Sequence, residues 1–392
     1  MSAGLAYLLF AGACVGHAAL WVPPLNYLYG CRIPKGVLKP FRLFAGLVIV
    51  AGWVGFPLAA GPDPADAVRL TLAGELGPLP QLYLGLCLVM GFVVFPAITA
   101  ARLLRKPPAA VVAETTRTLD LWPELGPKLL GTGKYRHLPR LPFNCVFRVD
   151  VTDLELELPS LPAAWDGLTV LHISDLHFIG TPSRAYFDRV IDELVAAGPP
   201  DVVALTGDFV DTLTHHKWII PVLGRLKWRE AGLAILGNHD YHFRPERIRR
   251  RLARLGYRVL GNGWEVVTVR GLPLAAIGHE GPWFRPAPDL TGLPEEGFRL
   301  LLSHTPDHLA WAVRNRVDLM LSGHVHGGQV RLPVIGSIFV PSRLGRRYDA
   351  GTFAAGPTVL HVNRGLSGKE PLRFRCHPQV SRLTLRAKRP AG

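Results

Sequence analysis

The chain has 392 residues, with 44 Lys and Arg against 30 Asp and Glu, and a formal net charge of +14. This length is sufficient for one large domain and a second module. The five cysteines are scattered without a C-x-x-C pair, which argues against a zinc–thiolate site and a disulfide framework. Charges of +5 lie before Pro107 and the remaining +9 are dispersed. A membrane surface or a phosphorylated substrate explains them at least as well as nucleic acid, which we do not expect as a partner.

Residues 1–106 contain three long apolar stretches, at about 4–29, 43–60 and 82–104. Each is close to the ~20 residues that a membrane-spanning helix needs. No Lys or Arg precedes Arg32, which disfavours a cleaved signal peptide. The first loop is basic and the second mostly acidic, so the positive-inside rule predicts an outside N-terminus and a cytoplasmic catalytic domain at the inner (cytoplasmic) membrane. Re-entrant or buried helices are the alternative, and losing one span would reverse this orientation.

The chain changes character after Lys106. Residues 107–147 are punctuated by Pro and Gly and are expected to form a linker. From residue 148 to 392, alternating strand-like runs and amphipathic segments such as "SRAYFDRVIDELVAA" predict one α/β domain. We therefore expect a transmembrane module at 1–106, a linker at 107–147 and a soluble domain at 148–392.

Metal-ligating residue types follow five successive apolar runs in this domain. The runs are "TVLHISDLH", "DVVALTGDFVD", "LAILGNHD", "RLLLSHTPD" and "VDLMLSGHVHGG". In α/β sheets the carboxyl ends of strands converge, so these residues should form one site. A single His after a strand is more often a structural residue than a ligand, but five coincident examples reverse those odds.

The chemistry of the predicted cluster favours metal ions. Its donors are carboxylate, imidazole and amide groups without sulfur, which suits Mn, Fe, Zn or Mg, and they are numerous enough for two divalent ions. Two such ions can activate a bridging hydroxide and clamp a phosphoryl group. No P-loop, nucleophile elbow or dinucleotide-binding glycine motif competes with this interpretation.

The order D-x-H, G-D-x-x-D, G-N-H-D, a single His and G-H-x-H resembles the calcineurin-like metallophosphoesterase superfamily. The fuller strings "LHISDLHF", "GHVHGGQ" and "NRGLSGKEPLRFRCHPQV" resemble its bacterial, membrane-associated YaeI/YkuE-type phosphodiesterase branch. The resemblance covers about residues 148–388. It implies a four-layer αββα sandwich with metals at the sheet edge, here preceded by the helical transmembrane module.

The resemblance also implies roles for individual residues. The first metal ion would be held by Asp175, His177, Asp208 and His326. The second would be held by Asp208, Asn238, His304 and His324, so that Asp208 bridges the two ions. His239 would be the catalytic histidine and Asp211 the acid that orients it. Gly327 and Gly328 would leave room for substrate oxygens.

The implied activity is metal-dependent hydrolysis of phosphodiester or pyrophosphate bonds by attack of a metal-bridged hydroxide. Membrane anchoring makes lipid-linked phosphates attractive substrates, and the resemblance includes UDP-diacylglucosamine hydrolysis as one specific case. A phosphomonoesterase of the cell envelope and a non-catalytic metal-binding scaffold are the alternatives. In phosphoprotein phosphatases of this superfamily the G-D-x-x-D motif is followed by Arg-Gly. Here Thr212 and Leu213 stand in those positions, which argues against a phosphoprotein phosphatase. The native metal and the oligomeric state are left open.

Overall fold

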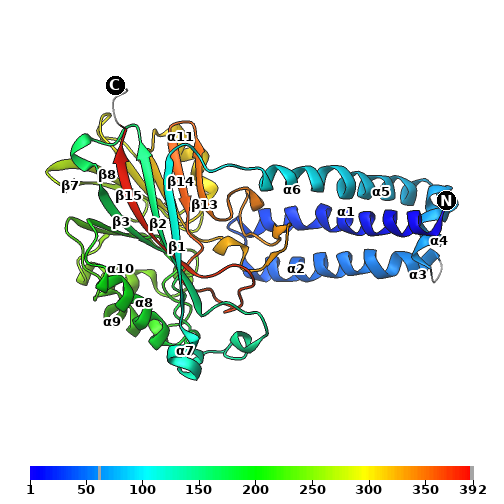
Figure 1. Cartoon of the computed structure of the whole chain (residues 1–392), viewed down its shortest axis with the longest axis horizontal. Coiled ribbons are helices and arrows are strands. Elements are labelled where there is room, and N and C mark those ends of the chain that lie inside the picture. Colours follow the sequence, from blue (N-terminus) through cyan, green and yellow to red (C-terminus); the bar gives the residue numbers. More distant parts are fainter. Residues whose placement is uncertain (61–62, 389–392) are drawn as a thin grey trace. The chain divides into compact units, whose positions relative to one another are not determined.

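The computed structural model describes residues 1–60 and 63–388 (Figure 1). The chain forms two compact units. One comprises Met1–Lys106 with Pro333–Arg347, and the other comprises Pro107–Leu332 with Tyr348–Gly392. The first unit therefore combines two segments that are more than two hundred residues apart in the sequence.

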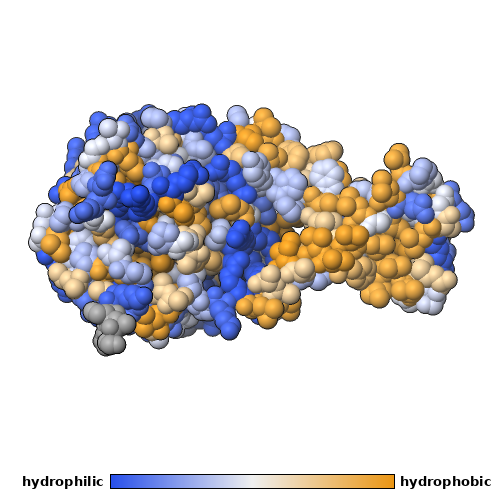
Figure 2. Space-filling model, turned by 90° about the horizontal axis from the view of Figure 1, so that it is seen from above, coloured by the Kyte–Doolittle hydropathy of each residue, from blue (hydrophilic) through white to orange (hydrophobic). Residues whose placement is uncertain are grey.

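Three helical segments of the first unit are long and apolar enough to cross a membrane: Ala3–Tyr29, Lys35–Leu58 and Pro78–Leu103. Their elements are α1 (Ala3–Tyr29), α2 (Lys35–Val50), α3 (Phe56–Ala60), α5 (Pro78–Val89) and α6 (Phe95–Leu103), with π-helical turns at Ala51–Gly55 and Met90–Val94. The short α4 (Pro64–Leu72) follows α3. Apolar side chains cover much of their outer surface (Figure 2). A water-exposed bundle would bury this surface instead.

Small residues and one histidine hold these helices together. A Cβ atom on Gly16 would lie 1.8 Å from the carbonyl oxygen of Cys87, so only glycine permits this close approach of α1 to α5. Close contacts through small residues are typical of helices packed in membranes. His17 of α1 lies 2.6 Å from the hydroxyl of Tyr83 and 3.0 Å from the carbonyl oxygen of Val48. His17 therefore links three helices through polar contacts.

The second unit contains a seven-stranded sheet in the order β1-β2-β15-β3-β4-β5-β6. Its strands β3 to β6 are parallel, whereas β15 pairs antiparallel with β3. The bounds are β1 (Val111–Asp120), β2 (Arg148–Leu158), β3 (Leu168–Ile173), β4 (Val202–Leu205), β5 (Ala231–Ala234), β6 (Arg258–Val259) and β15 (Gln379–Ala387).

A six-stranded mixed sheet has the order β13-β14-β10-β9-β8-β7. Its strands β14, β10, β9 and β8 are parallel, and both edge strands are antiparallel to their neighbours. The bounds are β7 (Trp264–Val269), β8 (Leu272–His279), β9 (Arg299–Ser303), β10 (Leu319–Ser322), β13 (Gly351–Ala355) and β14 (Thr358–Val362).

The period-two geometry of the strands supplies two cores. In β4, Val202 and Ala204 face the core between the two sheets, while Val203 and Leu205 face the core beneath the helices. This explains why the central strands are continuous apolar runs. The helices are α7 (Trp122–Leu125), α8 (Arg184–Ala196), α9 (Ile219–Leu223), α10 (Pro245–Arg254) and α11 (Leu309–Arg314).

Helix α8 shows how the sequence produces the outer layer. Its buried residues recur at three- and four-residue intervals: Tyr186, Phe187, Val190, Ile191 and Leu194. Together with α9 and α10 it covers the seven-stranded sheet, while the short α11 lies beside β14. The expected mixed α/β architecture is confirmed, with a thinner helical layer beside the six-stranded sheet.

Residues 107–147 differ from the expected linker because they include β1. This strand pairs antiparallel with β2 along its whole length, and Thr118 donates a 2.6 Å hydrogen bond to Asp150. Most of its side chains are exposed, since β1 is an edge strand. Its polar sequence therefore lacks the apolar alternation that identifies a half-buried strand.

Candidate metal centre

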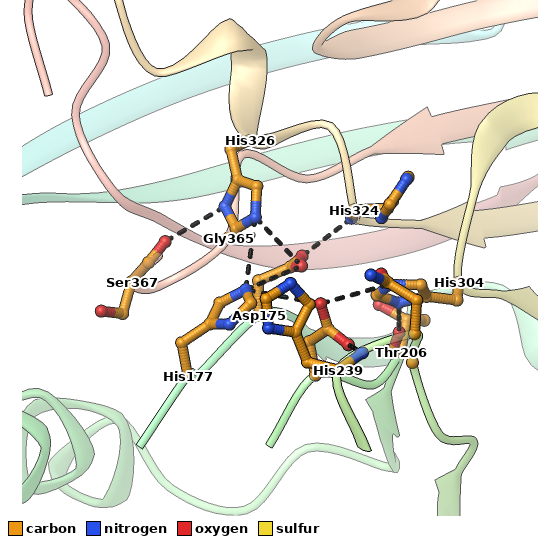
Figure 3. A network of polar contacts seen from close by, with 12 residues as sticks. Asp175, His177, Thr206, His239, His304, His324, His326, Gly365 and Ser367 are labelled. Carbon is orange, nitrogen blue, oxygen red and sulfur yellow. Dashed lines mark hydrogen bonds and ion pairs between the residues drawn. The ribbon is translucent and has the colours of Figure 1, made fainter. Parts of the chain in front are cut away.

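The predicted site residues all lie just beyond the carboxyl ends of five strands. Asp175 and His177 follow β3, Asp208 and Asp211 follow β4, and Asn238 and His239 follow β5. These three strands are parallel neighbours, so their ends share one edge. His304 follows β9, and His324 and His326 follow β10, the adjacent pair in the second sheet. Figure 3 shows the labelled members of this set, an aspartate and five histidines, gathered in one region.

One group of ligand atoms comes from Asp175, His177 and His326. Oδ1 of Asp175 lies 3.6 Å from Nε2 of each histidine, and the two Nε2 atoms are 3.3 Å apart. Nδ1 of His177 lies 2.8 Å from Asp211, and Nδ1 of His326 lies 3.1 Å from the carbonyl oxygen of Ser367. When the rings are neutral, these bonds place the protons on Nδ1 and leave both Nε2 lone pairs directed at one point.

A second group comes from Asp208, His304 and His324. Nε2 of His304 lies 3.5 Å from Oδ2 of Asp208 and 3.0 Å from Oδ1 of Asn238. Its Nδ1 lies 2.7 Å from the carbonyl oxygen of Thr206, which fixes the tautomer in the same way. Asn238 thus joins the three residues of this group.

Asp208 connects the two groups through a single oxygen. Its Oδ2 lies 3.5 Å from Nε2 of His177 on one side and 3.5 Å from Nε2 of His304 on the other. Its Oδ1 accepts a 2.8 Å hydrogen bond from the backbone N–H of His239. The carboxylate is therefore held in an orientation from which Oδ2 could serve two cations.

Unsatisfied polar atoms indicate that these groups fit metal ions. Oδ1 of Asp175 and Nε2 of His324 are among the buried polar atoms of the described residues that have no hydrogen-bond partner. A buried polar atom of this kind costs about 1–3 kcal/mol when it has no partner. Carboxylate oxygens and neutral imidazole nitrogens are ordinary ligands of Zn, Fe and Mn. Divalent cations would complete the coordination of these donors.

The electrostatics of the site favour the ligating forms of several side chains. Burial lowers the pKa of His324 and of His326 to about 3, so both rings are neutral. Burial opposes ionisation of Asp175, but the neighbouring histidines outweigh it and hold its pKa well below the usual value. Burial also disfavours a charged His304, yet Asp208 raises the pKa of that ring to about 9. His304 must therefore lose a proton before it can bind a metal ion at neutral pH.

Backbone strain coincides with the predicted ligands. Five of them have a positive φ: Asp175 (55°), His177 (44°), Asp208 (57°), His324 (69°) and His326 (52°). Non-glycine residues rarely adopt this conformation, which costs on the order of 1–3 kcal/mol each. Such strain clusters at functional sites, because the surrounding structure is needed to maintain it.

Asp211 and His239 occupy the positions that the family pattern assigns to the catalytic pair. One oxygen of Asp211 contacts Nδ1 of His239, and its other oxygen lies 2.8 Å from Nδ1 of His177. The side chain of His239 is 17% exposed, whereas those of Asp211 and His177 are almost completely buried. Asp211 thus orients two imidazoles, one within the metal-ligand cluster and one that solvent can reach.

Asp240 is the last residue of the G-N-H-D motif, and the structure gives it a role that the motif did not assign. Its carboxylate accepts hydrogen bonds from the backbone N–H groups of Asp208, Phe209, Val210 and Gly237. A Cβ atom on Gly237 would lie 2.2 Å from Oδ1 of Asp208, so glycine is needed beside this carboxylate. Asp240 and Gly237 therefore shape the loops that carry Asp208 and Asn238.

Two arginines also support the site from distant positions. Arg249 of α10 pairs with the buried Glu280, whose Oε1 accepts a 2.7 Å hydrogen bond from the backbone N–H of Leu236. Arg373 is completely buried and donates a 3.3 Å hydrogen bond to the carbonyl oxygen of His326. The sequence holds no local signal for either contact, because each joins segments remote in the chain.

The role expected for Gly327, which follows the G-H-x-H motif, is not the one that the structure shows. It was expected to leave room for substrate oxygens, but a Cβ atom there would lie 2.8 Å from Sγ of Cys376 and 3.1 Å from Cγ of Arg364. Its φ is 63°, which also favours glycine. Gly327 therefore permits close packing of this turn against neighbouring protein atoms.

The fold and the clustered carboxylates and imidazoles define a metallophosphoesterase. Residues 168–328 match the calcineurin-like phosphoesterase family. The chain is 31% identical over 248 residues to a metallophosphoesterase, YkuE, of Bacillus subtilis, an alignment that covers 61% of this chain and 86% of that protein. It is 32% identical over 228 residues to the phosphodiesterase YaeI of Escherichia coli, covering 55% and 81%.

A third relative is the "transmembrane protein with metallophosphoesterase domain" of Danio rerio. It is 30% identical over 197 residues, which cover 46% of this chain and 45% of that protein. The chain therefore belongs to the calcineurin-like metallophosphoesterase family, as the resemblance of its motifs indicated, and is a metal-dependent phosphoester hydrolase.

Proposed function

We propose that this protein is a membrane-anchored phosphoesterase with two divalent cations, acting on phosphodiester or pyrophosphate bonds. The observation that carries the proposal is the position of Asp208. One of its oxygens lies 3.5 Å from nitrogen atoms of both His177 and His304, which belong to different ligand groups. An aspartate shared in this way is suited to a two-metal site.

We assign the ligands as the family pattern does. Asp175, His177, Asp208 and His326 hold one ion, and Asp208, Asn238, His304 and His324 hold the other. Bound as a pair, the cations supply activation of water and neutralisation of the phosphoryl charge. The native metal is Mn, Fe, Zn or Mg in this proposal, since the donor set contains no sulfur.

His239 and Asp211 supply the protein's own acid–base group. Asp211 holds Nδ1 of His239, so Nε2 is the nitrogen available to the substrate. From this position Nε2 would hydrogen bond to a phosphoryl oxygen or deliver a proton to the leaving oxygen. His239 is suited to this task because it is the more accessible of the two rings that Asp211 orients.

The relatives and the helices support a proposal for the substrate class. YaeI is named a phosphodiesterase, which favours a diester over a monoester. Three apolar helices and a transmembrane relative support integral attachment to a membrane, which we propose is the inner membrane. We propose that the catalytic domain faces the cytoplasm and hydrolyses lipid-linked phosphates.

The activity is tested with the full-length protein in mild detergent. Hydrolysis of bis(p-nitrophenyl) phosphate and p-nitrophenyl phosphate would be measured with each candidate metal, alongside a UDP-linked diacyl lipid. We expect the diester or pyrophosphate to be cleaved, with losses of about 10²–10⁴ in kcat for His239→Ala. His137→Ala, at an exposed histidine outside the cluster, is the control. Faster hydrolysis of the monoester would support a phosphomonoesterase, and an inert wild type with bound metal would support a scaffold.

Membrane topology is tested separately with reporter fusions after Lys106. A cytoplasmic reporter such as a fluorescent protein should be active there, and alkaline phosphatase should be inactive. Strong alkaline-phosphatase activity at this position would place the catalytic domain outside and overturn the cytoplasmic assignment. Extraction of the full-length protein by alkaline carbonate would overturn integral attachment.

A further inference from the structure

The segment Pro333–Arg347 belongs to the helical unit, although it lies between strands of the catalytic domain in the sequence. Asn26, buried near the end of α1, fixes this segment in two directions. Its Nδ2 donates a 3.0 Å hydrogen bond to the carbonyl oxygen of Ile338, and its Oδ1 accepts a 3.0 Å hydrogen bond from the backbone N–H of Val340. These two hydrogen bonds fix the segment to the end of α1.

The helices and this segment enclose an elongated pocket with a cavity volume of about 1120 Å³. Its lining extends along α1 from Phe10 to Tyr27, a length of about 25 Å at 1.5 Å per residue. Val15, Ala18 and Ile98 are among the apolar side chains of its wall. This volume slightly exceeds the roughly 300–1,000 Å³ of typical small-ligand pockets. The shape suits an extended apolar chain.

One end of the pocket is lined by arginines from the end of α6 and from the segment Pro333–Arg347. Five line the pocket: Arg102, Arg105, Arg343, Arg346 and Arg347. Among the described residues that line the pocket there is no Asp or Glu. The pocket therefore combines a long apolar wall with a concentrated positive charge at one end.

The segment positions several of these guanidinium groups. Nη1 of Arg102 donates a 3.2 Å hydrogen bond to Oγ of Ser337, and Nη1 of Arg105 donates a 2.7 Å hydrogen bond to the carbonyl oxygen of Arg347. Arg105, Arg343 and Arg347 are exposed, so a ligand in the pocket can approach them. Guanidinium groups bind phosphate oxygens through paired, charge-assisted hydrogen bonds.

We propose that this pocket binds one anionic phospholipid, with its acyl chain along α1 and α6 and its phosphate at the arginine cluster. Charge complementarity selects this occupant, because a phosphate group carries negative charge that complements a cluster of five arginines, whereas an apolar peptide or a neutral lipid does not. Arg102 lies in the last turn of α6 and Arg105 follows the end of that helix, which is the level expected for lipid headgroups. The proposal rests on the proposed membrane location but is independent of catalytic turnover.

The test measures lipid binding to the full-length protein in detergent by native mass spectrometry. Phosphatidylglycerol and phosphatidylcholine with identical acyl chains are the probes, titrated separately. We expect one tightly bound phosphatidylglycerol and at least about tenfold weaker binding of phosphatidylcholine, since one charge-assisted hydrogen-bonding interaction accounts for a factor of this size.

Two kinds of variant separate the two ends of the pocket. Arg343→Gln combined with Arg347→Gln should weaken phosphatidylglycerol about tenfold or more without changing phosphatidylcholine. Ala18→Trp, which fills the apolar wall, should weaken both lipids. Arg69→Gln is the matched control, because Arg69 is a partly exposed arginine of α4 that does not line the pocket.

Circular dichroism and gel filtration must first show that each variant retains the wild-type fold. Equal binding of the two lipids by wild type, or unchanged phosphatidylglycerol binding in the double arginine variant, would overturn the proposal and indicate nonspecific lipid. Retained lipid selectivity in a protein without phosphoesterase activity would leave this proposal standing while the proposed function fails.

Discussion

Replacement of Asp211 by Asn separates the two functions that the structure gives this carboxylate. In the wild type its two oxygens contact Nδ1 of His177 and Nδ1 of His239. An asparagine has one carbonyl oxygen and one NH₂ group, so it can accept a hydrogen bond from only one of these rings. Nδ1 of the other ring then faces the NH₂ group of the asparagine, so its proton is no longer held on Nδ1 by an acceptor.

The expected losses in metal affinity and in kcat follow from the roles of His177 and His239. Disturbing the partner of a metal-ligating histidine typically lowers metal affinity about 10–100-fold. Disturbing a general acid–base group lowers the rate about 10²–10⁴-fold. We therefore expect Asp211→Asn to weaken metal binding and to reduce kcat, whereas His239→Ala reduces kcat and leaves metal affinity unchanged.

Metal affinity would be measured by isothermal titration calorimetry on chelator-treated protein, and kcat with bis(p-nitrophenyl) phosphate at saturating metal. The double variant should lose less activity than the product of the single losses, because the two side chains act through one contact. Asp153→Asn, at a 58% exposed carboxylate on β2, is the control. Wild-type metal affinity in Asp211→Asn, or loss of an ion in His239→Ala, would refute this reasoning.

Three further predictions concern stability and pH. Asp240→Asn should lower the free energy of unfolding by about 1–3 kcal/mol in urea titrations, because the carboxylate accepts four backbone hydrogen bonds; an unchanged midpoint would contradict this. Burial opposes ionisation of Asp201, but hydrogen bonds from Thr169 and the charge of Arg270 hold its pKa below the usual value. Asp201→Ala should therefore cost about 1–3 kcal/mol at pH 7, and the difference from wild type should shrink as the pH falls below about 4. The pKa of His304 is raised to about 9 by Asp208. The attraction between the charged ring and the Asp208 carboxylate therefore stabilises the metal-free protein fully below about pH 6.5, and this stabilisation is lost as the pH rises through 9. Metal binding must displace this proton, so calorimetry in buffers of different ionisation enthalpy should detect proton release at pH 7, and affinity independent of pH between 6 and 9 would contradict the assignment.

The sequence predicted the convergence of the site because strand ends carry a local signal. Runs such as "VVAL" in β4 are apolar on both faces, and their ends are marked by Gly and by metal-ligating residue types. Once such strands are placed in parallel, Asp175, Asp208 and Asn238 must meet at one edge. The mixed α/β fold was predictable for the same reason.

Other features depend on contacts that no local pattern encodes. The pairing of Arg249 with Glu280 and the bond from Arg373 to His326 join segments from different sheets or loops. The edge strand β1 lacked an apolar face, and Pro333–Arg347 lacked any signal that it packs with the helices. Contacts of this kind are set by the tertiary arrangement rather than by residue periodicity.

In the proposed metal centre, one carboxylate oxygen of Asp208 serves two cations. Anomalous diffraction from crystals of the full-length protein grown with Mn²⁺ tests it directly. We predict two anomalous peaks roughly 3.5–4 Å apart, one on the His177 side of Asp208 and the other on the His304 side. A single peak, or ions that do not contact Asp208, in crystals containing saturating Mn²⁺ would contradict the account.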